Sequence, residues 1–245
     1  MDFSQHTRSG NDFVIGRVAD DDPAYEKGEQ LILKLLCGIS ERTKPFCTHR
    51  FIDLPYTYSE RQLDSVILPT LSQLCGGLVL AELPVDRVVK SEDGSSFSSG
   101  RVDYWCIYRG YTFVIEVKHS YDGIKNNITR QDTLQCWETM VGSQLKSIRK
   151  TIRQCCEEKT RGVIRLGLHF ITSYSISRPS HELIRNYRLD LPEILRRLTR
   201  DMGKVATAPN FACAWEIPWE YVRVNTTETY CGLIVIAKIH HLLQF

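Results

Sequence analysis

The central part of the chain opens with an amphipathic helical pattern. Apolar residues recur there every three or four positions, which is the spacing of one helix face. They are Leu63, Val66, Ile67 and Leu71. Ser59 and Gln62 stand at the positions of a capping box, in which side chains satisfy free backbone groups at the start of a helix. Because Gly76 and Gly77 favour the left-handed backbone that ends helices, the pattern predicts a helix from Ser59 to just before Gly76.

Three runs rich in β-branched and aromatic residues follow, and this composition is typical of strands. They cover residues 78–89, 101–108 and 111–118. The polar segment SEDGSSFSSG predicts a loop between the first two runs. Arg109-Gly110 predicts a tight turn between the second and the third, which are therefore expected to be antiparallel neighbours.

A second helix and a fourth strand complete this region. Apolar residues at helical spacing predict a long helix from about Thr129 to Glu158. They are Leu134, Trp137, Met140, Val141, Leu145, Ile148 and Ile152. Residues 163–176 form a further strand-like run. The middle of the chain therefore has the order helix, three strands, helix, strand, which is an α/β pattern.

Weaker patterns lie on both sides of this region. Residues 1–21 are polar and predict a loosely held arm, and Asp22-Pro23 predicts the start of a helix that runs to Leu36. Turn-forming residues favour a connection with one short strand over residues 38–58. The C-terminal part predicts a helix around 192–202 and strands at 213–217 and 231–239.

The composition indicates one folded domain. The chain has 245 residues, 42% of them apolar and 24% charged, which is ordinary for a globular protein. We interpret residues 1–245 as a single elaborated domain, in which a core of residues 57–178 carries an N-terminal extension (1–56) and a C-terminal extension (179–245). The net charge of +2 neither requires nor excludes nucleic acid. Without an apolar run of membrane-spanning length or a hydrophobic N-terminal signal region, we expect a cytoplasmic protein with no membrane partner.

The nine cysteines are scattered along the chain, and none of them forms a CxxC pair. Several lie in apolar runs, where Cys behaves as a small hydrophobic residue. We expect buried free thiols, with a zinc site as the minor alternative.

Charged residues interrupt the third strand-like run near its end. Side chains alternate between the two faces of a strand, so Glu116 and Lys118 share a face and Val117 lies on the other. A carboxylate and an ammonium group on an otherwise apolar strand are costly to desolvate unless a metal ion or a charged substrate compensates them. Asp103 lies early on the preceding run, so an antiparallel pairing of the two strands brings it close to Glu116.

Two carboxylates and one lysine at one place suit metal-assisted phosphodiester hydrolysis. Magnesium, or manganese in its place, takes oxygen ligands, which Asp103, Glu116 and the backbone carbonyl of Val117 can supply. Such a metal polarises a phosphate and lowers the pKa of a bound water. Lys118 would orient or help deprotonate that water and stabilise charge on the phosphate. The alternative is a structural cluster of ion pairs at a strand edge.

Asp103, twelve intervening residues and then Glu116-Val117-Lys118 form a pattern that resembles the PD-(D/E)XK nuclease superfamily. The order of elements over residues 57–178 is similar to the common core of that superfamily. Val102 stands where the superfamily name has Pro, a variation that the superfamily tolerates. The resemblance implies a restriction-endonuclease-like fold, with a central mixed sheet flanked by helices.

The superfamily resemblance also implies helper residues on the two helices. An acidic residue on the first core helix often assists the metal, and Glu60 matches it best, with Asp64 in reserve. The alternative for Glu60 is an acidic residue that the helix dipole favours. Some members carry a Gln on the second helix, which Gln144 matches, although a Gln at the edge of the core is the alternative.

Other polar residues near this motif have readings of their own. His119 follows Lys118, points to the opposite face and is more typical of a structural role. Glu82 either joins the site or pairs with Arg87.

Basic residues continue the second predicted helix and could contact phosphates. They are Lys146, Arg149, Lys150 and Arg153. A second basic region follows later in the chain, and its members are Arg185, Arg188, Arg196, Arg197, Arg200 and Lys204. A solvated helix face is the alternative for both groups.

The resemblance implies a magnesium- or manganese-dependent deoxyribonuclease, an endonuclease in restriction, repair or antiviral defence against foreign DNA. DNA is favoured over RNA as the nucleic-acid partner. A protein of another class stays open, namely a catalytically silent nucleic-acid-binding protein that keeps the fold. A third hypothesis is a regulated nuclease that needs a small ligand or a partner protein. A homo-oligomer is the alternative to a regulatory partner protein.

Overall fold

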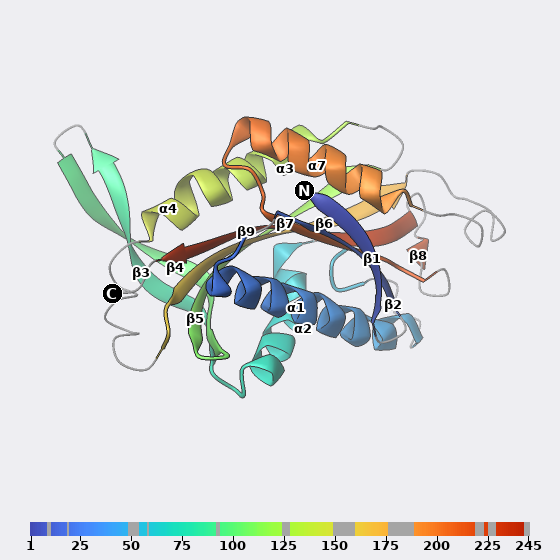
Figure 1. Ribbon diagram of the computed structural model, residues 1–245, viewed down its shortest axis with the longest axis horizontal. Helices are drawn as coiled ribbons and strands as arrows, with labels where there is room; N and C mark the ends of the chain where they lie inside the picture. Colours follow the sequence, from blue (N-terminus) through green and yellow to red (C-terminus); the bar gives the residue numbers. More distant parts are fainter. Residues whose placement is uncertain are drawn as a thin grey trace.

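The structure is a computed structural model of the chain (Figure 1). It describes residues 1–8, 11–18, 20–48, 54–57, 59–91, 94–123, 128–148, 160–175, 189–218, 223–224 and 229–242.

A single mixed sheet with helices on both faces confirms the α/β class. The nine-stranded sheet has the order β1-β2-β7-β9-β6-β5-β4-β3, and β8 also pairs with β9. Its strands are β1 (Asp2–Arg8), β2 (Asn11–Arg17), β3 (Val79–Ser91), β4 (Gly94–Tyr108), β5 (Tyr111–Gly123), β6 (Val163–Ser175), β7 (Phe211–Glu216), β8 (Arg223–Val224) and β9 (Thr229–Leu242). The pairing of β5 with β6 is parallel, and the other pairings are antiparallel.

The helices form a layer on each face of the sheet (Figure 1). They are α1 (Pro23–Thr48), α2 (Glu60–Leu74), α3 (Gln131–Trp137), the π-helix η1 (Glu138–Gln144), α4 (Leu145–Ser147) and α7 (Leu191–Val205). Helices α1 and α2 cover one face, and the continuous segment α3-η1-α4 covers the other together with α7. Within the part of the chain that the structure describes, no helix combines the length and apolar character needed to span a membrane.

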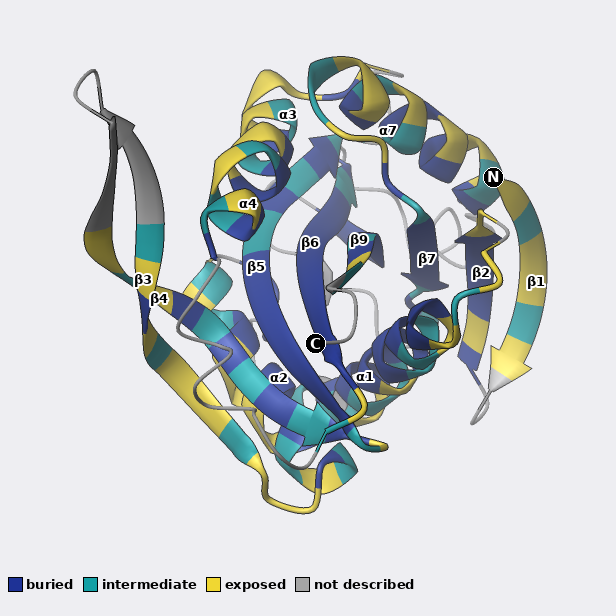
Figure 2. Cartoon of the chain, turned by 60° about the vertical axis from the view of Figure 1, so that its left-hand side comes forward, coloured by how far each residue is buried: buried dark blue, intermediate teal, exposed yellow. Residues whose placement is uncertain are grey.

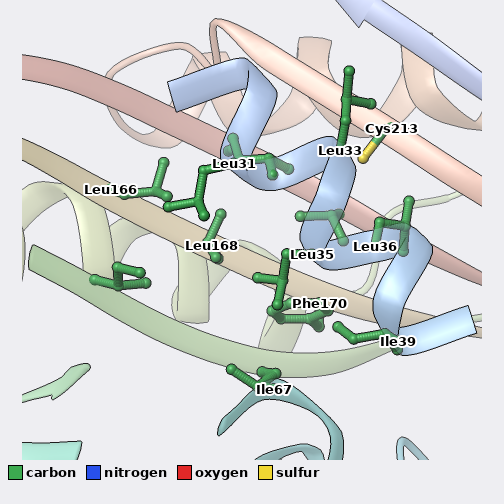
Figure 3. Packing of buried hydrophobic residues seen from close by; sticks show 14 of the residues in the cluster. Leu31, Leu33, Leu35, Leu36, Ile39, Ile67, Leu166, Leu168, Phe170 and Cys213 are labelled. Atoms are coloured by element: carbon green, nitrogen blue, oxygen red, sulfur yellow. The ribbon is translucent and has the colours of Figure 1, made fainter. Parts of the chain in front are cut away.

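The central strands are buried on both faces, as Figure 2 shows for β5 and β6. Their runs are therefore nearly continuous in apolar residues rather than alternating, as expected for strands between two helix layers. Leu166, Leu168 and Phe170 of β6 point toward α1, where they meet Leu31 and Leu35 (Figure 3). This packing anchors β6, which pairs in parallel with β5.

The prediction of a loosely held N-terminal arm was wrong. Residues 1–21 contain β1 and β2, and β2 joins the sheet through β7, with Phe13 opposite Trp215 and Ile15 opposite Cys213. Phe13, Val14 and Ile15 are buried there. The partner strand lies about two hundred residues further along the chain, so no local pattern indicated this pairing.

The first helix is longer than its pattern predicted. We expected an end near Leu36, but α1 continues to Thr48 with Pro45 inside it. Gly38 begins the stretch 38–58 that was predicted as a connection, whereas it lies in the helix beside α2. A Cβ at Gly38 would approach Thr70 Cγ2 to 2.3 Å, so the glycine allows close packing of the two helices.

The polar segment 91–100 was predicted as a loop, yet β4 begins at Gly94 and pairs with β3 from the register Ser91↔Gly94 onward. The two strands form a long hairpin that continues beyond the rest of the sheet (Figure 1). Backbone hydrogen bonds between strands need no apolar side chains. A strand can therefore form in this serine-rich segment, although its composition does not predict one.

The predicted long helix from Thr129 to Glu158 is shorter in its described part. Helical turns cover α3, η1 and α4 as far as Ser147, and Ile148 is extended, with φ −76° and ψ 102°. Ile148 forms an isolated bridge with Arg87 of β3. The rest of the predicted helix, residues 149–158, lies outside the described residues.

Candidate active site

The hairpin of β4 and β5 brings Asp103 and Glu116 together. Its turn is formed by Arg109 (φ 50°) and Gly110 (φ 81°), the two left-handed positions of a two-residue hairpin turn. The pairing runs from Tyr108↔Tyr111 to Tyr104↔Ile115, and one further residue in this register places Asp103 opposite Glu116. Asp103 Oδ2 accepts a hydrogen bond of 2.6 Å from the backbone N–H of Val117. Two carboxylates thus lie at the same level of adjacent strands.

Strand alternation directs the side chain of Glu116 on β5 away from α1 and α2. Phe113, Ile115 and Val117 are buried in the core under those helices. Glu116 lies on the other face, where it pairs in register with Gly167 of β6. A Cβ at that glycine would approach the side chain of Leu145 of α4 to 2.7 Å. The α3-η1-α4 segment therefore packs closely over the sheet beside Glu116.

Desolvation dominates the electrostatics of the carboxylates. The side chain of Glu116 is 2% exposed, and burial raises its pKa to about 7, with Arg87 opposing this and Asp103 adding to it. Burial also raises the pKa of Asp103, against the hydrogen bond from Val117. For Glu60, burial raises the pKa and Lys118 opposes the shift. Crowded, poorly solvated carboxylates of this kind favour a cation among them.

Lys118 lies between the sheet and the start of α2. Its Nζ is 3.5 Å from Oε1 of Glu60 and donates a 2.9 Å hydrogen bond to the carbonyl of Val117. Glu60 belongs to the first turn of α2, where Gln62 accepts a 3.2 Å hydrogen bond from the backbone N–H of Ser59. This half of the capping box fixes the helix start, and so the position of Glu60 beside Lys118.

The reserve candidate on α2 has a different partner. Asp64 accepts a hydrogen bond from the hydroxyl of Tyr104, which lies on the face that α2 covers. Of the two acidic residues on this helix, Glu60 is the one that the fold brings to Lys118.

Arg87 of β3 is a site residue whose role the sequence did not indicate. Its Nη2 lies 2.6 Å from Glu116 Oε1, and its Nη1 donates to the carbonyl of Gln144 at 3.0 Å. The suggested pairing of Glu82 with Arg87 is wrong, because Glu82 pairs with Arg101 at 3.4 Å on the surface. Glu82 has a left-handed φ of 55°, and the ladder between β3 and β4 skips it.

One signal in the sequence could have pointed to Arg87. It lies two residues after the buried Val85, hence on the same strand face, and Gly100 lies opposite Val85 in register. A Cβ at Gly100 would come within 2.5 Å of Arg87 Nε. Gly100 on the opposite strand leaves space for the side chain of Arg87 to turn inward.

Gln144 ends the π-helix that faces this part of the sheet. A π-helical turn is rare and is frequent at functional sites. Gln144 is half-buried, and its side-chain Oε1 is buried without a hydrogen-bond partner among the described residues. Its carbonyl contacts Arg87, so Gln144 is linked to Glu116 through the guanidinium group. The predicted inward direction holds for the side-chain oxygen.

His119 has a structural environment, as its position predicted. Its Nε2 lies 3.0 Å from Thr172 Oγ1, and burial lowers its pKa to about 4. Its side chain leaves the strand on the face of Val117, away from Glu116.

The basic groups are only partly described. Lys146 is exposed on α4, whereas Arg149, Lys150 and Arg153 lie outside the described residues. In the second region, Arg185 and Arg188 also lie outside them. Arg197 is buried in an ion pair with Asp122, so its assignment to a phosphate-contacting surface was wrong. The exposed members Arg196, Arg200 and Lys204 each pair with an acidic neighbour.

The predicted metal ligands do not form a closed coordination shell. Within the described ranges, no group of three or more His, Cys, Asp or Glu side chains has the geometry to hold a metal ion. Two of the predicted ligand oxygens already accept hydrogen bonds from the protein. The Val117 carbonyl accepts one from Lys118, and Oε1 of Glu116 accepts one from Arg87. The second carboxylate oxygens of Asp103 and Glu116 are the hard donors that suit magnesium. The donor chemistry fits the ion through these two carboxylates, with Glu60 further out beside Lys118.

Comparisons with known proteins assign no family. No family model and no curated protein matches the chain. Among solved structures, the crystal structure of SSO0001 is similar at 16% identity, covering 77% of this chain and 86% of that one. The TM-score of 0.24 is too low to carry an argument about fold or function. Any assignment of function to this chain therefore depends on the geometry of the site.

Proposed function

We propose that the protein is a metal-dependent nuclease of the PD-(D/E)XK type that hydrolyses phosphodiester bonds in DNA. One observation carries the proposal: Asp103 and Glu116 lie opposite each other on adjacent antiparallel strands, and Lys118 follows on the same face as Glu116. The order α2, β3, β4, β5, α3-η1-α4, β6, with β6 parallel to β5, supports it, because the superfamily core has the same order.

The chain's own residues have distinct tasks in this reaction. Asp103 and Glu116 would hold a magnesium ion, which supplies a Lewis acid and a water of lowered pKa. Lys118 presents its ammonium group beside these carboxylates, where it can orient the attacking water and stabilise negative charge on the phosphate. Glu60, 3.5 Å from Lys118 Nζ, positions that ammonium group.

A cleavage assay tests the proposal. Supercoiled plasmid, single-stranded and duplex DNA oligonucleotides and RNA are incubated with magnesium, manganese or a chelator. Glu116→Gln, Asp103→Asn and Lys118→Met should each lower metal-dependent cleavage by at least about a hundredfold, the size typical of lost electrostatic catalysis. Glu193→Gln is the matched control, because it removes an exposed carboxylate from α7. Cleavage that survives all three site substitutions would refute the assignment.

A second candidate function is a nucleic-acid-binding protein that is silent until a partner or small ligand acts on it. The ion pair between Arg87 and Glu116 favours it, because a cation of the protein already occupies one of the two principal carboxylates. Gel-shift measurements with the same variants separate the two functions. DNA binding without cleavage under any metal condition favours the silent protein.

A further inference from the structure

Arg87 is held by the protein on four sides. Nη1 donates to the carbonyl of Gln144 at 3.0 Å and to the hydroxyl of Ser147 at 3.3 Å. Nη2 donates to Glu116 at 2.6 Å and to the carbonyl of Arg101. These acceptors come from β4, β5, η1 and α4, so the guanidinium group joins two neighbouring strands and the helical segment around one carboxylate.

The hairpin has room for this arginine because Gly100 has no side chain. A Cβ there would lie within 2.6 Å of both Nε and Cδ of Arg87. All four terminal N–H groups are used by protein acceptors, and the fork geometry of arginine fixes their directions. Arg87 would have to abandon these bonds to contact a substrate phosphate, which favours a permanent role inside the protein.

The charges around Glu116 suggest what that role is. Three carboxylates, those of Asp103, Glu116 and Glu60, are accompanied by two cationic groups, those of Arg87 and Lys118. Glu116 is the most buried of the three carboxylates, and a buried charge without a partner is strongly destabilising. Arg87 supplies the charge that Glu116 needs when no metal ion is bound.

We propose that Arg87 is the resident counter-cation of the candidate site: it compensates Glu116 in the metal-free protein and competes with the divalent cation for it. The inference rests on the proposed metal site. It explains why a deeply buried carboxylate is tolerated without a metal. It also makes the affinity for the cation weaker than two carboxylates alone would give, because like charges repel.

Metal-dependent thermal stability and calorimetric titration of the full chain test the inference, with manganese chloride as the probe. Arg87→Met removes the charge and keeps the aliphatic stem. We expect a lower Tm without metal, a larger manganese-induced rise in Tm than in the wild type, and a Kd for manganese about tenfold tighter or more, from the loss of one neighbouring positive charge. Arg17→Met is the matched control, because it removes the arginine of an Arg–Glu pair at the other side of the sheet. It should leave the response to manganese unchanged.

Equal responses to manganese in wild type and Arg87→Met, including no response in either, overturn the inference. If Arg87→Met does not fold, the test moves to the Glu116→Gln background, where the most buried of the three carboxylates needs no compensation. The double variant should then fold, with a Tm lowered by the lost hydrogen bonds to Gln144, Ser147 and Arg101 alone. A double variant that does not fold overturns the inference.

The cleavage assay separates this inference from the proposed function. Tighter manganese binding by Arg87→Met in a protein that cleaves no nucleic acid supports the counter-cation and sinks the nuclease. Cleavage that depends on Glu116, with manganese affinity unchanged in Arg87→Met, supports the nuclease and refutes the counter-cation.

Discussion

The buried ion pair between Asp122 at the end of β5 and Arg197 of α7 offers a sharp test of how β5 is anchored. Arg197 Nη2 lies 2.6 Å from Asp122 Oδ2, and the two side chains are 4% and 0% exposed. Arg197 also donates to Thr129 Oγ1 at 3.1 Å. Replacing Arg197 with Met leaves the carboxylate of Asp122 buried and uncompensated.

The magnitude follows from the burial. Removing one partner of a buried pair costs about 3–5 kcal/mol. Asp122 Oδ1 and Arg197 Nε have no partners among the described residues, so the pair is incompletely satisfied and we expect the lower part of that range, about 3–4 kcal/mol. For a chain of this length that corresponds to a Tm lower by about 6–16 °C. Arg196→Met on the same helix is the matched control, because Arg196 is exposed. It should cost less than about 1 kcal/mol.

Urea denaturation followed by circular dichroism gives the free energies. The double variant Arg197→Met/Asp122→Asn should recover much of the loss, because no charge is left in the core. The loss of unfolding free energy caused by Arg197→Met should also become smaller as the pH is lowered toward 5. Burial already raises the pKa of Asp122, and without Arg197 a proton can neutralise the carboxylate. If Arg196→Met and Arg197→Met lower the free energy of unfolding by similar amounts, the reasoning is refuted. Arg197 would then behave as an exposed residue.

Three further predictions test other parts of the structure. Gly100→Ala should displace the Arg87 side chain and destabilise the protein by about 1–3 kcal/mol in urea denaturation, and no loss would contradict the contact. His169 is fully buried and its pKa falls to about 3, so the unfolded chain takes up a proton first, and stability should drop as pH falls below about 6.5. Between pH 6.5 and 5 this amounts to about 2 kcal/mol, and His169→Leu should lose that part of the pH dependence, which a parallel pH series checks. Phe170→Ala should open a cavity under α1 and cost about 3–5 kcal/mol by the same urea assay, and a loss below about 1 kcal/mol would mean that α1 does not pack there.

Local patterns determined a large part of the fold. The period of the apolar residues and the turn residues located α2, the strands β5 and β6 and the helix α7, because each signal lies within one element. Strand alternation together with a two-residue turn was sufficient to place Asp103 opposite Glu116 and Lys118 on the face of Glu116. That prediction needed contacts only between neighbouring stretches of chain.

The remaining features depend on contacts between segments that are distant in sequence. The strand β2 exists because β7 offers it an edge, and α1 continues through Gly38 because α2 packs against that glycine. The π-helical turn before Gln144 shifts residues away from the regular helical spacing on which a pattern depends. Backbone pairing and close packing depend on which segment lies alongside and not on local composition. These elements were therefore decided by the tertiary structure alone.

The candidate site divides in the same way. Periodicity and a hairpin turn placed its two carboxylates and its lysine, whereas the sequence left open whether Glu82 joins the site or pairs with Arg87. Which glutamate Arg87 meets depends on the register of β3 with β4, on the left-handed turn at Glu82 and on the carbonyl of Gln144. A charge selects its partner by distance in the folded chain, and that distance is set only after the hairpin and the helix segment have packed together.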